Sequence, residues 1–155
     1  MSTQDIKRLT VSLIHLEWLG RVLGLYTLTD RPTLDELVVG LPSMVFLSYP
    51  DGAEIVKEGE RGEELYMLFK GGAAVTREGA HVADLVPGDI FGEVGFLVGV
   101  PRTATVKAGR ECELFRIHAG DLEEFLGRHK ELLDALRTTA KRRMQRLLGK
   151  GEAAA

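Results

Sequence analysis

The segment from Phe91 to Val106, F-G-E-V-G-F-L-V-G-V-P-R-T-A-T-V, combines residue types that could hold a phosphate. Gly92 allows close backbone approach, and the first amides of a short helix after it would point outward without intrahelical partners. Arg102 could add a bidentate contact to the same phosphate. Glu93 would repel an anion, so we expect the ligand to carry a hydroxyl as well, such as the 2′-hydroxyl of a ribose.

The alternative for Glu93 and Arg102 is an ordinary surface ion pair, which would contribute little to stability. Either residue alone would favour that alternative. Their spacing, together with the glycines near them, favours a binding site.

These residues resemble the phosphate-binding cassette of the cyclic-nucleotide-binding domain family, usually written F-G-E-x-[AGS]-x-L, four variable residues and R-[ST]-A. The positions that match are Phe91, Gly92, Glu93, Gly95, Leu97, Arg102, Thr103 and Ala104. Two upstream stretches also resemble family motifs: E-G-E-R-G-E-E-L-Y-M-L-F-K-G at Glu58–Gly71 and L-V-P-G-D at Leu85–Asp89. Glu63 stands where the family usually has Asp, and we interpret this departure as neutral for binding. The resemblance covers Leu34 to Leu148.

The resemblance implies a role for each matching residue. Glu93 would hold the ribose 2′-hydroxyl and Arg102 would pair with the cyclic phosphate. Backbone amides of Gly92, Gly95 and Thr103 would donate to the phosphate, and the Thr103 hydroxyl would be a further donor.

The resemblance also implies a lid, because in this family the last helix folds over the base. Arg143 is the residue placed to do so, and Leu97 and Val86 would pack around the sugar and base. A one-turn error in the alignment would put a neighbour in the place of Arg143: Arg142, Leu147 or Leu148. The complete expected ligand site is Val86, Phe91, Gly92, Glu93, Val94, Gly95, Leu97, Arg102, Thr103, Ala104 and Arg143.

The choice between cAMP and cGMP depends on Thr103 and the residues beside it. A threonine at position 103 can donate to a syn guanine, as in some cGMP-selective relatives. The run R-T-A-T-V also resembles bacterial relatives that bind cAMP, and we favour cAMP over cGMP. The expected cofactor set is one cyclic nucleotide as regulatory ligand and no metal.

The elements that must position these residues follow from the spacing of glycines and apolar residues. Short strands separated by turn residues between Met44 and Ile117 predict a sandwich or barrel. The expected strands are 45–48, 54–57, 64–69, 73–77, 81–85, 89–91, 103–107 and 112–117. With the resemblance, the expected fold class is α+β: an antiparallel β-roll or jelly-roll barrel flanked by N-terminal helices and C-terminal B and C (lid) helices.

The segment before these strands predicts helices. Apolar residues at helical spacing predict a helix from Ile6 to Tyr26, with Gly20 and Gly24 as break points. This helix is apolar on two faces, so either it packs against its own domain or it forms a dimer or partner surface. Thr33 is the expected N-cap of a short helix that Pro42 ends, with Glu36 completing a capping box.

The segment after the strands also predicts helices. Asp121 is the expected N-cap of the first, with Glu124 at the capping-box position. A second helix follows Gly127 with apolar residues four apart: Leu132, Leu136, Ala140, Met144 and Leu148. The expected organisation is an N-terminal helical segment at 1–32, the ligand-binding domain at 33–150 and a tail at 151–155.

The bulk properties exclude several classes of protein. A formal net charge of −3 does not suit general nucleic-acid binding, and one cysteine, Cys112, suits a reducing, cytoplasmic compartment. No signal peptide or membrane span is expected. The four histidines, His15, His81, His118 and His129, are scattered, which argues against a cupin-type metalloenzyme. We expect no enzyme activity, and Cys112 as a buried apolar residue.

Many relatives are helix-turn-helix regulators, but too few residues follow Leu148 for such a module, so DNA binding is not expected. The expected partner is another protein or a second copy, contacted through the N-terminal or C-terminal helices. Three alternatives stay open: a stand-alone sensor, a fragment of a longer channel, kinase or transcription regulator, and a scaffold whose pocket is degenerate.

Overall fold

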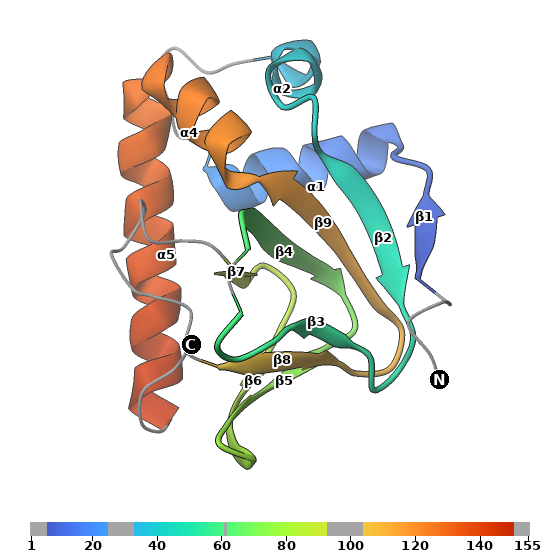
Figure 1. Ribbon diagram of the computed structural model, residues 1–155. Helices are drawn as coiled ribbons and strands as arrows, with labels where there is room; N and C mark the ends of the chain where they lie inside the picture. Colours follow the sequence, from blue (N-terminus) through green and yellow to red (C-terminus); the bar gives the residue numbers. More distant parts are fainter. Residues whose placement is uncertain (1–5, 25–32, 61, 93–103, 151–155) are drawn as a thin grey trace.

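The computed structural model describes residues 6–24, 33–60, 62–92 and 104–150. Two antiparallel sheets face each other (Figure 1). The first sheet has the order β1 (Lys7–Leu9), β2 (Val45–Tyr49), β9 (Cys112–His118), β4 (Glu64–Lys70) and β7 (Ile90–Gly92). The second has the order β3 (Glu54–Val56), β8 (Thr105–Ala108), β5 (Ala73–Arg77) and β6 (Ala80–Leu85). The expected strands are confirmed, each to within two residues at either end, and so is the antiparallel β-roll.

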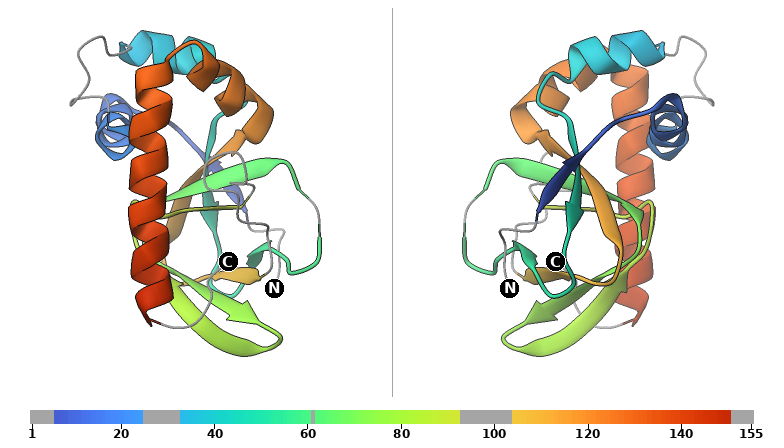
Figure 2. Two further views of the ribbon diagram at one scale, coloured as in Figure 1. Left: turned by 90° about the vertical axis from the view of Figure 1, so that its left-hand side faces the viewer. Right: turned by 90° about the vertical axis from the view of Figure 1, so that its right-hand side faces the viewer.

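Helices pack against one face of the first sheet. They are α1 (Leu13–Leu23), α2 (Leu34–Gly40), α4 (Ala119–Gly127) and α5 (Lys130–Lys150). Helix α5 runs along one side of the molecule for most of its height (Figure 2), and it contacts α4, α1 and β6. In the described part of the chain, no helix is both long and apolar enough to cross a membrane.

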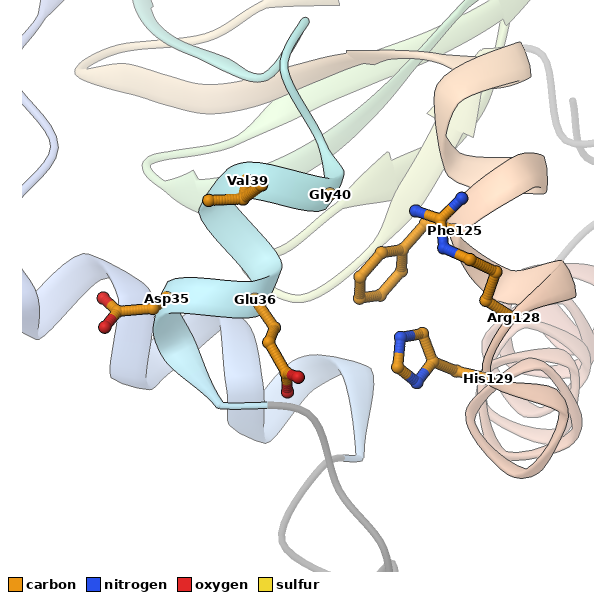
Figure 3. A pocket seen from close by; sticks show the side chains of 7 residues that line it. All are labelled: Asp35, Glu36, Val39, Gly40, Phe125, Arg128 and His129. Atoms are coloured by element: carbon orange, nitrogen blue, oxygen red, sulfur yellow. The ribbon is translucent and has the colours of Figure 1, made fainter.

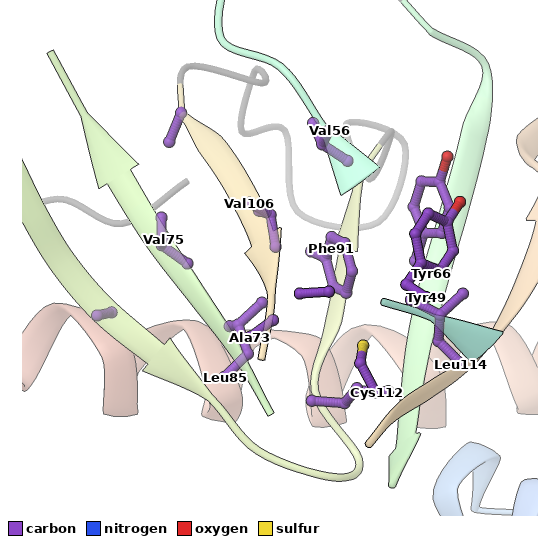
Figure 4. Packing of buried hydrophobic residues seen from close by; sticks show 14 of the residues in the cluster. Tyr49, Val56, Tyr66, Ala73, Val75, Leu85, Phe91, Val106, Cys112 and Leu114 are labelled. Carbon is purple, nitrogen blue, oxygen red and sulfur yellow. The ribbon is translucent and has the colours of Figure 1, made fainter. Parts of the chain in front are cut away.

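The first sheet is buried on both faces because neighbouring residues of a strand point to opposite sides. On β9, Phe115 faces the helices and Leu114 faces the second sheet. The core on the helical side contains Leu19, Leu23, Leu37, Leu41, Phe46, Leu65, Met67, Phe115, Ile117, Leu122, Phe125, Leu126, Leu132 and Leu136. The core inside the roll is shown in Figure 4 and contains Leu47, Tyr49, Val56, Tyr66, Leu68, Ala73, Val75, Ala83, Leu85, Phe91, Ala104, Val106, Ala108, Cys112 and Leu114.

The N-terminal segment differs from the expected helix. Residues Lys7–Leu9 form strand β1, whose register on β2 runs from Lys7 opposite Ser48 to Leu9 opposite Phe46. The helical spacing of the apolar residues there was misleading, because the open edge of β2 supplies backbone partners that a local pattern does not reveal.

Helix α1 begins only at Leu13, and Gly20 lies inside it as a buried residue, so the expected break at Gly20 is wrong. The break at Gly24 is confirmed: this residue is the C-cap, with a φ of 82° that glycine adopts at little cost. Leu19 and Leu23 are buried, whereas Leu13 and Ile14 are 62% and 71% exposed. Helix α1 therefore packs against its own domain through one face only.

The sequence predicted the N-caps of two helices, α2 and α4. The capping box of α2 is confirmed: the Thr33 amide donates to Glu36 Oε1 at 2.8 Å, and the Glu36 amide donates to Thr33 Oγ1 at 3.1 Å. Asp121 is not the N-cap of α4. His118 takes that position, because β9 continues directly into the helix, and Asp121 instead accepts a hydrogen bond from the amide of Ser43 at 3.2 Å.

Candidate functional site

Strands β7 and β8 lead into and out of the expected phosphate-binding segment. Strand β7 belongs to the first sheet and β8 to the second, so the segment between them joins the two layers of the roll. Six expected ligand residues lie outside the described residues: Glu93, Val94, Gly95, Leu97, Arg102 and Thr103. The structure places the residues on either side of them, which are Phe91, Gly92 and Ala104.

Gly92 ends β7 opposite Leu65 of β4 and has a φ of 100°. A Cβ atom at this position would lie 2.7 Å from the carbonyl oxygen of Glu64 and 2.9 Å from Cδ1 of Tyr66. Both the conformation and the close approach require glycine here.

Phe91 and Ala104 lie in the core rather than at a surface open to a ligand. Phe91 is 5% exposed, and its ring stacks on that of Tyr66 with 5.2 Å between the ring centres. Ala104 is fully buried beside the start of β8. Both residues belong to the core inside the roll, on either side of the expected phosphate-binding segment. Figure 4 shows the Phe91 ring in that core.

Val86 lies in the turn between β6 and β7 and is 42% exposed. The turn is held by Asp89, whose Oδ2 accepts a hydrogen bond from the Val86 amide at 2.8 Å. The amide of Gly88 donates to the carbonyl of Leu68 at 2.7 Å. Asp89 is 1% exposed. Its role in fixing this turn was not inferred from the sequence, although it belongs to the L-V-P-G-D stretch.

Two ionisable residues, Tyr49 and Cys112, lie in the core inside the roll. Burial raises the pKa of Tyr49, while the positive charge of Arg116 and hydrogen bonds with Arg116 and Tyr66 oppose that rise. Cys112 lies beside this group. Burial, with a smaller contribution from the charge of Glu113, raises the pKa of its thiol to about 11. The thiol is therefore a poor nucleophile and a poor metal ligand at neutral pH.

Arg143, the expected lid residue, lies on α5, and its side chain is outside the described part of the chain. The helix that carries it is anchored at its start, because Leu132 and Leu136 are fully buried, as expected from their spacing. Helix α5 then contacts β6, the strand that leads to Val86.

A cleft of about 320 Å³ opens between α2 and the junction of α4 with α5 (Figure 3). Its lining residues are Asp35, Glu36, Val39, Gly40, Phe125, Arg128 and His129. The floor is closely packed: a Cβ atom on Gly40 would collide with the ring of Phe125. None of these residues belongs to the expected ligand site.

The histidines pair with carboxylates in two places. His81 Nε2 lies 2.9 Å from Asp84 Oδ1 on the surface of β6, and His118 Nε2 lies 2.8 Å from Glu63 Oε1. Neither pair has a third ligand, since no group of three histidine, cysteine or acidic residues suited to a metal occurs within the described ranges. The His118–Glu63 pair joins residues 55 apart and was not inferred from the sequence.

The two facing antiparallel sheets and the helices packed on them define an α+β domain built on a β-roll. The family model of the cyclic nucleotide-binding domain matches residues 46–129, which is more than half of the chain, and the protein belongs to that family. The matched range includes both edges of the expected phosphate-binding segment.

The relatives in this family are longer proteins. A cyclic nucleotide-gated potassium channel of Rhizobium etli is 33% identical over 91 residues, which is 59% of this chain and 25% of the channel. A cAMP-dependent protein kinase regulatory subunit of Debaryomyces hansenii is 48% identical over 61 residues, or 39% of this chain and 14% of that protein. This chain thus spans a quarter or less of the length of these two relatives.

The fold is shared with solved structures. A cyclic nucleotide-binding domain from Methylobacillus flagellatus has a TM-score of 0.73 over 94% of this chain and 87% of its own, with 18% sequence identity.

Proposed function

We propose that this chain binds a 3′,5′-cyclic nucleotide, cAMP in preference to cGMP, in the segment between β7 and β8, and signals binding to a partner protein through α5. The observation that carries the proposal is the geometry of Gly92. Its φ of 100° and the Glu64 carbonyl oxygen, 2.7 Å from where a Cβ atom would be, require glycine at the point where the proposed phosphate-binding residues begin.

The proposed contacts follow the order of the chain after Gly92. Glu93 accepts the ribose 2′-hydroxyl and Arg102 pairs with the cyclic phosphate, while amides from Gly92 to Gly95 and at Thr103 donate to it. Leu97 and the exposed Val86 cover the sugar and base.

The proposed output is movement of α5, with Arg143 closing over the base. A ligand can shift an equilibrium only by its difference in affinity for the two states. A change from mostly open to mostly closed requires about 10⁴-fold preference, or ~5.5 kcal/mol. A charge-assisted contact from Arg102 together with several amide donors could supply much of that.

The preference for cAMP rests on the R-T-A-T-V run and on the name of the related kinase regulatory subunit, which is cAMP-dependent. The proposal assigns the chain a regulatory role in the cytoplasm, without catalysis, metal or DNA binding. Residues 33–150 form the sensor, and the N-terminal segment packs on it through Leu19 and Leu23. A degenerate scaffold of the same fold is the alternative.

Calorimetric titration with cAMP and with cGMP tests the proposal. Arg102→Ala should weaken binding about 10- to 100-fold, because a hydrogen bond to a charged group contributes about 1.5–3 kcal/mol. The exposed Arg110, in the turn between β8 and β9, supplies the control: Arg110→Ala removes the same charge and should bind as the unmodified protein does. If neither nucleotide binds at high micromolar concentration, the sensor proposal fails and the scaffold alternative replaces it.

A further inference from the structure

Helix α4 is attached to the first sheet by a group of hydrogen bonds at its first turn. The amide of Ala119 donates to the backbone carbonyl of Glu63 at 2.6 Å, and the amide of His118 donates to Ser43 Oγ at 3.0 Å. The Ser43 amide in turn donates to Asp121 at 3.2 Å. The start of α4 is therefore fixed to both β2 and β4, through the residues that precede these two strands.

The His118 side chain links the helix to Glu63. Its Nδ1 accepts a hydrogen bond from the Gly120 amide at 3.1 Å, so this nitrogen carries no proton. Its Nε2 lies 2.8 Å from Glu63 Oε1, and a carboxylate can only accept, so Nε2 carries the proton and donates. One neutral tautomer satisfies both contacts, and the imidazole bridges the α4 cap and the residue that precedes β4.

Glu63 also directly precedes the residues of β4 that lie next to Gly92, where the expected phosphate-binding segment begins. The next residue, Glu64, places its carbonyl oxygen 2.7 Å from where a Cβ atom of Gly92 would be, and Leu65 pairs with Gly92 in the sheet. In the sheet Glu64 lies opposite His118, so β4 connects Gly92 to the start of α4. The contact between the Glu63 and His118 side chains is a second connection between β4 and α4. Helix α4 in turn packs against α5.

We propose that His118 is a positioning residue for nucleotide affinity: through Glu63 it sets the place of α4 and α5 relative to the start of the phosphate-binding segment. This inference rests on the proposed function. The pair is solvent-exposed, so its effect lies in alignment and is modest in size.

The test distinguishes the two roles of the His118 side chain, which caps α4 and contacts Glu63. His118→Asn keeps a good N-cap but is too short to reach Glu63. It should leave the melting temperature nearly unchanged and weaken cAMP binding about three- to tenfold, the size of one ordinary hydrogen bond. Glu63→Ala should weaken binding equally, whereas Glu63→Gln, whose carbonyl oxygen can still accept from Nε2, should restore it.

The matched control is His81→Asn, which removes a histidine–carboxylate contact of similar length within β6. It should not change cAMP affinity. The inference is overturned if His118→Asn binds cAMP as tightly as the unmodified chain, or if His81→Asn weakens binding as much.

Amide hydrogen exchange of the ligand-free chain tests the same connection without nucleotide. His118→Asn should speed exchange in β7, which is remote in sequence from the substitution, and His81→Asn should not. If the chain binds no nucleotide, the proposed function fails, and hydrogen exchange alone tests whether the contact between His118 and Glu63 affects β7. Unchanged exchange in β7 would then overturn the inference.

Discussion

Gly92 ends strand β7 in a left-handed conformation, and the carbonyl of Glu64 occupies the space that a side chain would need. Gly79, in the turn between β5 and β6, has a similar φ of 82° but no atom within 4 Å of the Cβ position. Alanine substitutions at the two glycines therefore distinguish the free-energy cost of the backbone conformation from the cost of a collision with the Glu64 carbonyl.

Gly92→Ala should lower the free energy of unfolding by about 1–3 kcal/mol, because strain and overpacking act together. It should also weaken cAMP binding at least tenfold, since the chain after β7 must shift. Gly79→Ala should cost only the conformational strain, roughly 1 kcal/mol, and leave affinity unchanged. Urea unfolding and calorimetry measure both quantities. Equal affinities for the two variants would contradict a role for Gly92 in the site.

At the scale of elements, α2 and α4 are held together at one close point. The last residue of α2, Gly40, has no room for a Cβ atom, which would lie 2.3 Å from Cδ1 of Phe125 on α4. Gly127, at the end of α4, has open space around its Cβ position. The two helices thus approach closely because Gly40 has no side chain.

Gly40→Ala should lower the free energy of unfolding by about 1–3 kcal/mol, because the buried Phe125 ring must shift to make room for the methyl group. Gly127→Ala should be neutral or stabilising by up to about 1 kcal/mol, as expected for glycine replaced by alanine in a helix. Thermal and urea unfolding compare the two. A Gly40→Ala variant as stable as the Gly127→Ala variant would show that α2 does not pack on α4 in solution.

At the scale of the whole molecule, stability depends on keeping ionisable groups neutral between the two sheets. Cys112 is fully buried, and the pKa of its thiol is raised from 9.0 to about 11. The unfolded chain therefore loses this proton at lower pH than the folded chain does. The contribution to stability is complete below pH 9 and declines as the pH rises toward 11.

The free energy of unfolding should accordingly fall between pH 9 and pH 11, and Cys112→Ala should reduce the slope in that range. Urea unfolding at several pH values measures it. In the folded chain at pH 8 the thiol should resist alkylation, whereas the urea-unfolded chain should react readily. Rapid alkylation of the folded chain would contradict the burial of Cys112 inside the roll.

Features that depend on neighbours in the chain could be predicted. The capping box of Thr33 and Glu36, the break in the helix at Gly24 and the positions of the short strands between turn residues depend on local sequence, and the structure confirms them. The motif from Phe91 to Ala104 also indicated the family, because its residue types and order are specific without any knowledge of the fold.

Features that depend on distant partners could not be predicted. Lys7–Leu9 form a strand because β2, nearly forty residues later, offers an open edge. His118 rather than Asp121 caps α4, and Glu63 meets His118 across 55 residues. Phe91 matches a ligand motif, yet only the facing of the two sheets directs its ring into the core. The sequence alone determined most of the elements, the family and the expected ligand chemistry. Tertiary structure decided which groups support the site, because long-range pairing of backbone and side chains leaves no periodic pattern in the chain.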